Sequence, residues 1–218
     1  MLKQLIIILT VFLFSISEAK QWVEVNSSDI IESSFIHDSN GLSSTEISFE
    51  LSGYFLKKLK DGVMITAPGG VSMLKKGAPD LPIFTTSIQI PDLAKMQLEV
   101  ISSDYVDVKI ESIVPSKGNI TRNVDISSLP FEKSSMYDKN SFYPENISYL
   151  RSPYIIRTKR GQAVVFQPFQ YNPIEGYLRV HTNITIKVKA NGISTDNPLV
   201  RVPSKNRGER EMEEIYSR

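Results

Sequence analysis

The feature that most limits how this chain can fold is an alternation of apolar and polar residues with a period of two. It is longest in YLRVHTNITIKVKA, residues 177–190. Successive side chains of a β-strand point to opposite faces, so this pattern predicts a long antiparallel strand that is buried on one face. The predicted buried face consists of Leu178, Val180, Ile184, Ile186 and Val188, and the predicted outward face of Tyr177, Arg179, His181, Asn183, Thr185, Lys187 and Lys189.

Shorter runs of the same kind occur along most of the chain. They occupy residues 46–59, 84–91, 95–114 and 162–169, and the third of them contains two strand-like segments around Ser102-Ser103. β-branched and aromatic residues are frequent in these runs, as is typical of strands. Pairs with turn chemistry separate them, including Asp61-Gly62, Gly69-Gly70 and Asn191-Gly192. Because the body shows no sustained helical periodicity, we predict an all-β fold, an antiparallel β-sandwich of jelly-roll-like type.

The first 19 residues have the pattern of a secretory signal peptide. Lys3 precedes an apolar run from Leu5 to Phe14, and Ser17 and Ala19 supply the small residues before a cleavage site after Ala19. The apolar run is shorter than the roughly 20 residues that span a bilayer. We therefore expect an exported protein, periplasmic or secreted, that is not held at a membrane once the signal is removed. An exported chain without cysteine favours a bacterial source.

The chain becomes polar after the last predicted strand. From Ile193 onward it reads as a linker or tail, and GEREMEEIYSR, residues 208–218, predicts a short C-terminal helix. The sequence thus divides into a signal peptide (1–19), a β-sandwich domain (20–192) and a polar tail (193–218).

Composition removes several classes of function. The chain has no cysteine, so it has neither disulfides nor a thiol nucleophile. His37 and His181 are its two histidines, too few for a three-histidine metal site. It contains no GxSxG sequence and no glycine-rich phosphate loop. The formal net charge of +1 argues against nucleic acid as a partner, because binding to phosphates needs a basic surplus. We expect no catalytic activity, no metal and no cofactor.

Several short motifs, taken together, resemble the N-terminal pro-domain of the gingipain family of secreted bacterial cysteine peptidases (peptidase family C25). The resemblance covers roughly residues 70–190, and its motifs follow the family's order. They are GAPDLP (77–82), VPSKGNITR (114–122), FYPENI (142–147), RGQAVVFQPFQYNP (160–173) and LRVHTNITIKV (178–188).

The resemblance implies a function that the alternation does not show. Pro-domains of this family are β-sandwiches that assist folding of the zymogen and hold it latent, while the catalytic Cys and His lie in a separate domain. A loop of the pro-domain lies across the active-site cleft and places a basic side chain in the pocket for the residue that precedes the scissile bond. By motif match that side chain is Arg122, and the rest of the predicted inhibitory loop is Lys117, Gly118, Thr121 and Asn123. The implied partner is the cognate catalytic domain, and we expect the chain to be a monomer or to form a 1:1 complex with that enzyme.

Arg218 fits the same resemblance. A polar tail is the kind of segment in which proteolysis concentrates. An Arg-specific peptidase that removes its own pro-segment would leave an arginine at the new C-terminus. We therefore predict Arg218 as a processing site.

The residues also leave a second function open. A secreted β-sandwich can be a binding module for carbohydrate or for a surface partner. The outward face of residues 177–190, with Tyr177, Arg179, His181 and Asn183, offers aromatic and polar groups for such contacts.

Overall fold

A computed structural model describes residues 20–26 and 33–201. The predicted signal peptide with its cleavage site after Ala19, the predicted helix in 208–218 and the predicted processing site at Arg218 lie outside these residues. Within the described part, no helix is both long enough and apolar enough to cross a membrane.

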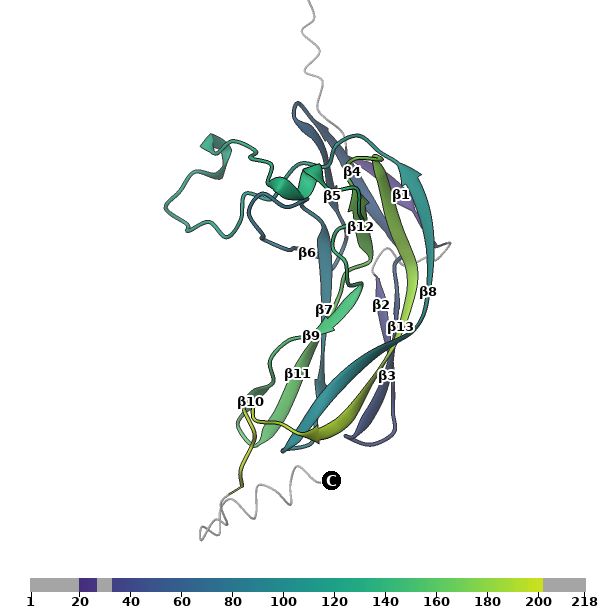
Figure 1. Cartoon of the computed structure of the whole chain (residues 1–218), viewed down its shortest axis with the longest axis vertical. Helices are drawn as coiled ribbons and strands as arrows, with labels where there is room; N and C mark the ends of the chain where they lie inside the picture. The colour runs from purple at the N-terminus through teal and green to yellow at the C-terminus, as the bar shows by residue number, and fades with distance from the viewer. Residues whose placement is uncertain (1–19, 27–32, 202–218) are drawn as a thin grey trace, which may run out of the picture.

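The described chain forms two five-stranded antiparallel sheets and one three-stranded sheet (Figure 1). The first sheet has the order β12 (Phe169–Asn172), β13 (Tyr177–Ile193), β3 (Ser44–Glu50) and β2 (Ser34–Ser39), with β8 (Ala94–Lys109) paired to β13. The second has the order β10 (Tyr154–Ile156), β11 (Lys159–Phe166), β7 (Pro82–Gln89) and β6 (Val71–Ser72), with β9 (Ser148–Leu150) paired to β11. The third has the order β1 (Gln21–Glu24), β4 (Gly53–Leu59) and β5 (Gly62–Thr66). Two single-turn 3-10 helices, η1 (Ile126–Ser128) and η2 (Ser135–Asp138), follow β8.

The hydrophobic core lies between the two five-stranded sheets. Phe49 of β3 packs against Phe84 of β7 and Phe166 of β11, with ring centroids 4.9 and 5.4 Å apart. All five apolar residues of the alternating run in β13 are fully buried, as predicted. Large apolar side chains removed from water on both inner faces are the main source of stability for a sandwich of this kind. The prediction of an all-β antiparallel sandwich is confirmed.

Three details of the strand prediction are wrong. Residues 46–59 are two strands in different sheets, because the chain leaves β3 at Leu51-Ser52 to enter β4. Residues 95–109 are one strand rather than two, because a bulge at Ile101 lets β8 continue past Ser102-Ser103. Asn191-Gly192 is not a turn: it lies within β13, where Gly192 has a φ of +89° at an irregularity in the pairing with β8.

The sandwich extends beyond the predicted boundary at residue 192. β13 ends at Ile193, and the next residues stay in contact with the connection between β7 and β8. The Ser194 N–H donates to the Leu93 carbonyl over 2.8 Å, and the Leu199 N–H donates to the Asp92 carbonyl over 2.9 Å. We refer to residues 194–201 as the exit segment.

Candidate functional site: an arginine-bearing loop

The candidate site is the loop of residues 117–133, which projects from one end of the sandwich (Figure 1). The outgoing stem is held by two hydrogen bonds, from the Ser116 N–H to the Ala78 carbonyl (2.7 Å) and from the Gly77 N–H to the Ser116 carbonyl (2.9 Å). The loop returns at Ser134, whose N–H donates to the carbonyl of Gly77 (2.9 Å). Gly77 therefore ties both ends of the loop to one point on the sandwich.

Gly118 begins the loop in a backbone conformation that glycine adopts far more readily than other residues. Its φ is +84°, and it is buried. A Cβ at this position would lie 2.9 Å from the Cβ of Lys76. The absence of a side chain at Gly118 is thus needed twice, for the left-handed φ and for the close approach of Lys76.

Lys117 points back into the loop. Its Nζ donates to the carbonyl of Ile126 (2.8 Å) and lies 4.4 Å from the centre of the Phe131 ring. An ion pair between Lys76 and Glu132 (3.1 Å) links the loop to the neighbouring GAPDLP segment. Lys117 therefore braces the loop from within, whereas a pocket-filling residue must be free to leave it.

Arg122 lies in a turn of the loop that is closed by a hydrogen bond from the Val124 N–H to the Thr121 carbonyl (3.1 Å). The Thr121 hydroxyl donates to Oδ1 of Asn123 (2.5 Å), which fixes the turn from its other side. Arg122 is exposed and, within residues 20–26 and 33–201, makes no hydrogen bond, ion pair or cation–π contact. The structure brings all five predicted loop residues together and leaves the guanidinium of Arg122 available to a partner.

The turn is followed by a short capped helix that carries apolar side chains. Asp125 accepts hydrogen bonds from the N–H and the hydroxyl of Ser127 at the start of η1. These hydrogen bonds lower the pKa of the Asp125 carboxyl, so the cap is ionised at neutral pH. Val124 and Ile126 beside it expose 38% and 58% of their surface. The turn and the start of η1 therefore offer one cation flanked by apolar surface.

The outward face that was considered for carbohydrate is not free. His181 is buried, against the prediction of an outward position, because Tyr105 of β8 packs against its ring and the neighbouring strands β8 and β12 supply partners for both of its ring nitrogens. Its Nε2 and Nδ1 lie 2.8 Å from Gln170 Oε1 and 2.6 Å from Ser103 Oγ. Arg179 is bonded to Asp107 through Nε and Nη2, both at 2.8 Å. Two of the four side chains proposed for a sugar are thus already engaged.

His181 makes the stability of the domain depend on pH. Burial, and the nearby Arg179 cation, lower the pKa of His181 to about 4 from the ordinary 6.5. In the folded domain His181 stays neutral down to about pH 4, whereas in the unfolded chain it is protonated below its ordinary pKa of 6.5. Protonation therefore favours the unfolded chain, and the stability that is present above pH 6.5 is lost as the pH falls towards 4.

We expect the free energy of unfolding to fall by about 2–3 kcal/mol between pH 6.5 and 4.5 through this residue. Urea unfolding at several pH values measures this loss. The His181→Gln variant carries an amide that does not titrate. In this variant the difference in the free energy of unfolding between pH 6.5 and pH 4.5 should shrink by that amount. An unchanged pH dependence would contradict the assignment to His181.

The part of the chain that the structure describes contains no group of three or more His, Cys, Asp or Glu side chains suited to a metal ion. The described residues thus form a β-sandwich module from which an arginine-bearing loop projects.

The comparisons with known proteins identify the family. The family model Propeptide_C25 matches residues 36–202, and the chain belongs to this family. It is 43% identical over 119 residues to gingipain R1 of Porphyromonas gingivalis, a match that covers 55% of this chain and 12% of the relative. It is 36% identical over 147 residues to gingipain R2 of the same species, covering 67% of this chain and 20% of the relative. The chain thus spans a small part of the length of these relatives.

Solved structures agree with this result. A structure described as the complex of the Porphyromonas gingivalis RgpB pro- and mature domains matches with a TM-score of 0.70 and 29% identity, over 83% of this chain and 94% of that one. A structure described as an insight into zymogenic latency of gingipain K matches with a TM-score of 0.66 and 20% identity, over 80% and 100%, and supports the fold. The resemblance inferred from the sequence is confirmed, and so is the prediction of a non-catalytic pro-segment.

Proposed function

We propose that this chain is an exported pro-domain that assists folding of a gingipain-like, Arg-specific cysteine endopeptidase and keeps it latent by placing Arg122 in its active-site cleft. The observation that carries the proposal is the exposed guanidinium of Arg122, which makes no hydrogen bond or ion pair with the described residues, in a turn of a loop whose two ends are both bonded to Gly77. Membership in the propeptide family supports it, as does the likeness to a pro-domain solved in complex with its mature domain.

The loop has the physical properties of a pseudo-substrate. A pocket that selects arginine offers a carboxylate to the planar guanidinium, which binds such a group through two parallel hydrogen bonds. The bracing by Lys117 and the closed turn at Thr121–Val124 limit the conformational entropy that the loop loses on binding. Exposed Val124 and Ile126 add apolar surface beside the cation for contact with the cleft.

The test of this proposal is selective inhibition. We expect purified residues 20–218 to inhibit an Arg-specific cysteine peptidase of the gingipain type in a slow, tight-binding manner, with little effect on papain-like enzymes, and to hydrolyse no peptide themselves. Progress curves with a fluorogenic arginyl substrate measure the inhibition constants. Equal inhibition of both enzyme types would show that the contact is non-specific, and peptidase activity that disappears on mutation of this chain would overturn the proposal.

A further inference from the structure

The exit segment is held to the end of the sandwich opposite the Arg122 loop (Figure 1). Besides its two backbone hydrogen bonds to Leu93 and Asp92, the Nδ2 of Asn197 donates to the Pro153 carbonyl over 3.0 Å. Asn197 has a φ of +45°, a left-handed conformation that asparagine tolerates better than most residues. Specific hydrogen bonds thus hold the exit segment in one path along the sandwich.

Arg160, the second residue of β11, is the centre of this attachment. Its side chain is fully buried. The guanidinium donates to two carbonyls of the exit segment, those of Asp196 (2.9 Å) and Asn197 (2.9 Å). It also donates to the carbonyls of Pro91 (2.9 Å), in the β7–β8 connection, and of Ala94 (2.7 Å), the first residue of β8. One planar cation therefore joins the exit segment to the body of the domain.

Arg201, the last described residue, is held by the same connection. Its Nε lies 2.5 Å from Oδ2 of Asp92, and its Nη2 donates to the Thr158 carbonyl over 3.2 Å. Asp92 thus binds the exit segment twice, through its carbonyl to Leu199 and through its carboxylate to Arg201.

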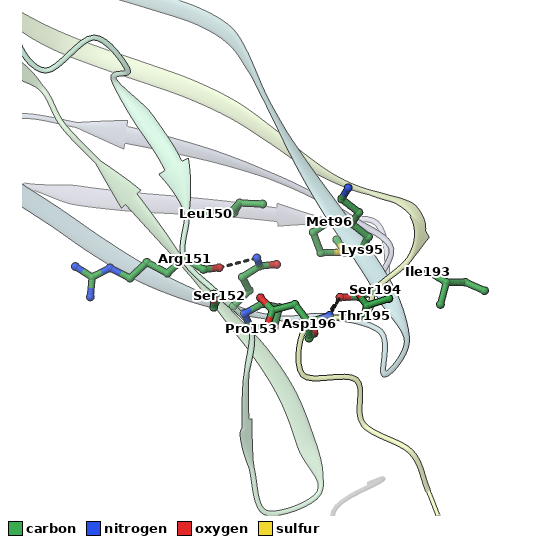
Figure 2. Close-up of a pocket in the computed structure, with 11 residues that line it drawn as sticks. Lys95, Met96, Leu150, Arg151, Ser152, Pro153, Ile193, Ser194, Thr195 and Asp196 are labelled. Atoms are coloured by element: carbon green, nitrogen blue, oxygen red, sulfur yellow. Dashed lines mark hydrogen bonds between the residues drawn. The ribbon is translucent and has the colours of Figure 1, made fainter.

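The exit segment also lines an open pocket of about 390 Å³ (Figure 2). Ser194, Thr195 and Asp196 form one wall, and Arg151 to Pro153 with the buried Gln162 form another. In Figure 2, Ser194 and Asp196 are hydrogen-bonded to each other across this wall. The exit segment therefore faces the connection between β9 and β10 across this pocket.

We infer that the exit segment is a latch that protects the peptide bond after Arg201 from Arg-specific cleavage while the domain is folded. A peptidase binds several residues on each side of the scissile bond in extended form and takes the arginine side chain into its pocket. Arg201 satisfies neither condition until it leaves Asp92 and the exit segment detaches, so cleavage requires local unfolding. The inference rests on the proposed function for its biological meaning: it removes Arg201 from the arginines of the chain at which the proposed peptidase can cut.

Trypsin tests the latch independently of any gingipain-like enzyme. Purified residues 20–218 are digested briefly, and mass spectrometry measures the rate of cleavage after Arg201. A synthetic peptide of residues 197–207 supplies the rate for the same bond without the fold. We expect cleavage in the folded chain to be at least about 100-fold slower than in the peptide, as for a bond that is cut only after local opening.

Two variants check the cause of the protection. Asp92→Ala removes the carboxylate that holds Arg201, and Asn197→Ala removes the bond to Pro153 and strains the left-handed φ. Each should speed cleavage after Arg201 at least about tenfold with the domain still folded by circular dichroism. Asp38→Ala, which removes an exposed carboxylate of β2, is the matched control and should leave the rate unchanged.

The outcomes separate the two proposals. Cleavage of the folded wild-type chain after Arg201 at the rate of the peptide would overturn the latch, and so would identical rates in Asp92→Ala, Asn197→Ala and wild type. Protection of Arg201 together with no inhibition of an Arg-specific cysteine peptidase would instead overturn the proposed function and leave the latch standing.

Discussion

Replacement of Arg122 by alanine is expected to weaken inhibition of an Arg-specific cysteine peptidase by about 30- to 1000-fold. That range corresponds to about 2–4 kcal/mol, the usual effect of removing a charged side chain that is buried at the centre of an interface. The stability of the free domain should change by no more than about 0.5 kcal/mol, because Arg122 is exposed and makes no hydrogen bond, ion pair or cation–π contact with the described residues. Inhibition constants and thermal unfolding of the same preparations measure the two quantities.

The conservative variant tests the geometry of the contact. Arg122→Lys keeps the charge but replaces the planar fork of the guanidinium by a single ammonium group, which cannot bind a carboxylate through two parallel hydrogen bonds. It should therefore lose part of the affinity toward an Arg-specific enzyme. Full retention of inhibition by Arg122→Lys would argue against a pocket that selects arginine.

Two controls separate the pocket contact from other effects of positive charge. Arg157→Ala removes an exposed arginine from the β10–β11 turn, at the other end of the molecule, and should leave inhibition unchanged. Lys117→Ala removes the brace to Ile126 and Phe131 and should weaken inhibition less than Arg122→Ala, because it loosens the loop without emptying the pocket. Equal losses for Arg122→Ala and Arg157→Ala would show that the chain contributes only general positive charge.

The strands were predictable from the sequence because a sheet that is buried on one face requires apolar and polar residues to alternate along each strand. The alternation in β13 follows from a pleated strand with one face in the core, and its apolar residues are buried as predicted. The break at Leu51-Ser52 and the bulge at Ile101 were missed, because a change of sheet or one extra residue in a strand scarcely alters an apolar pattern.

The candidate site was predictable in a different way. Nothing in the composition of PSKGNITRN distinguishes Arg122 from other exposed arginines, and the assignment came from the resemblance to the gingipain pro-domains. The structure adds why Lys117 and Arg122 differ: Lys117 is bonded inside the loop, whereas Arg122 is exposed and makes no hydrogen bond with the described residues.

His181 and Arg160 could not be placed from local sequence, since their partners are distant along the chain. His181 contacts Ser103 and Gln170, which lie 78 and 11 residues away. Arg160 contacts carbonyls up to 69 residues away. The one local signal for Arg160 was its position at the start of the apolar run GQAVVF, where a charge must either reach solvent or find several acceptors.

Replacement of Arg160 by methionine is expected to be the most destabilising single change considered for this domain, lowering the free energy of unfolding by about 3–5 kcal/mol. Methionine has a similar length and fills much of the same space. However, it leaves the carbonyls of Pro91, Ala94, Asp196 and Asn197 without their donor in a buried site. For a domain of this size the loss corresponds to a fall of roughly 6–20 °C in Tm, which differential scanning calorimetry measures.

Two variants make this result specific to the buried network. Arg160→Lys keeps the charge, but a single ammonium cannot donate to four carbonyls spread around a plane, so it should recover only part of the stability. Arg157→Ala, three residues earlier and exposed, should change the free energy of unfolding by no more than about 0.5 kcal/mol. If Arg160→Met has the Tm of the wild type, water must donate hydrogen bonds to the four carbonyls in that variant. The guanidinium would then not be the group that holds the exit segment to the sandwich. If Tm falls as expected, trypsin should also cut after Arg201 sooner in Arg160→Met than in Arg157→Ala, because the exit segment then opens at lower cost.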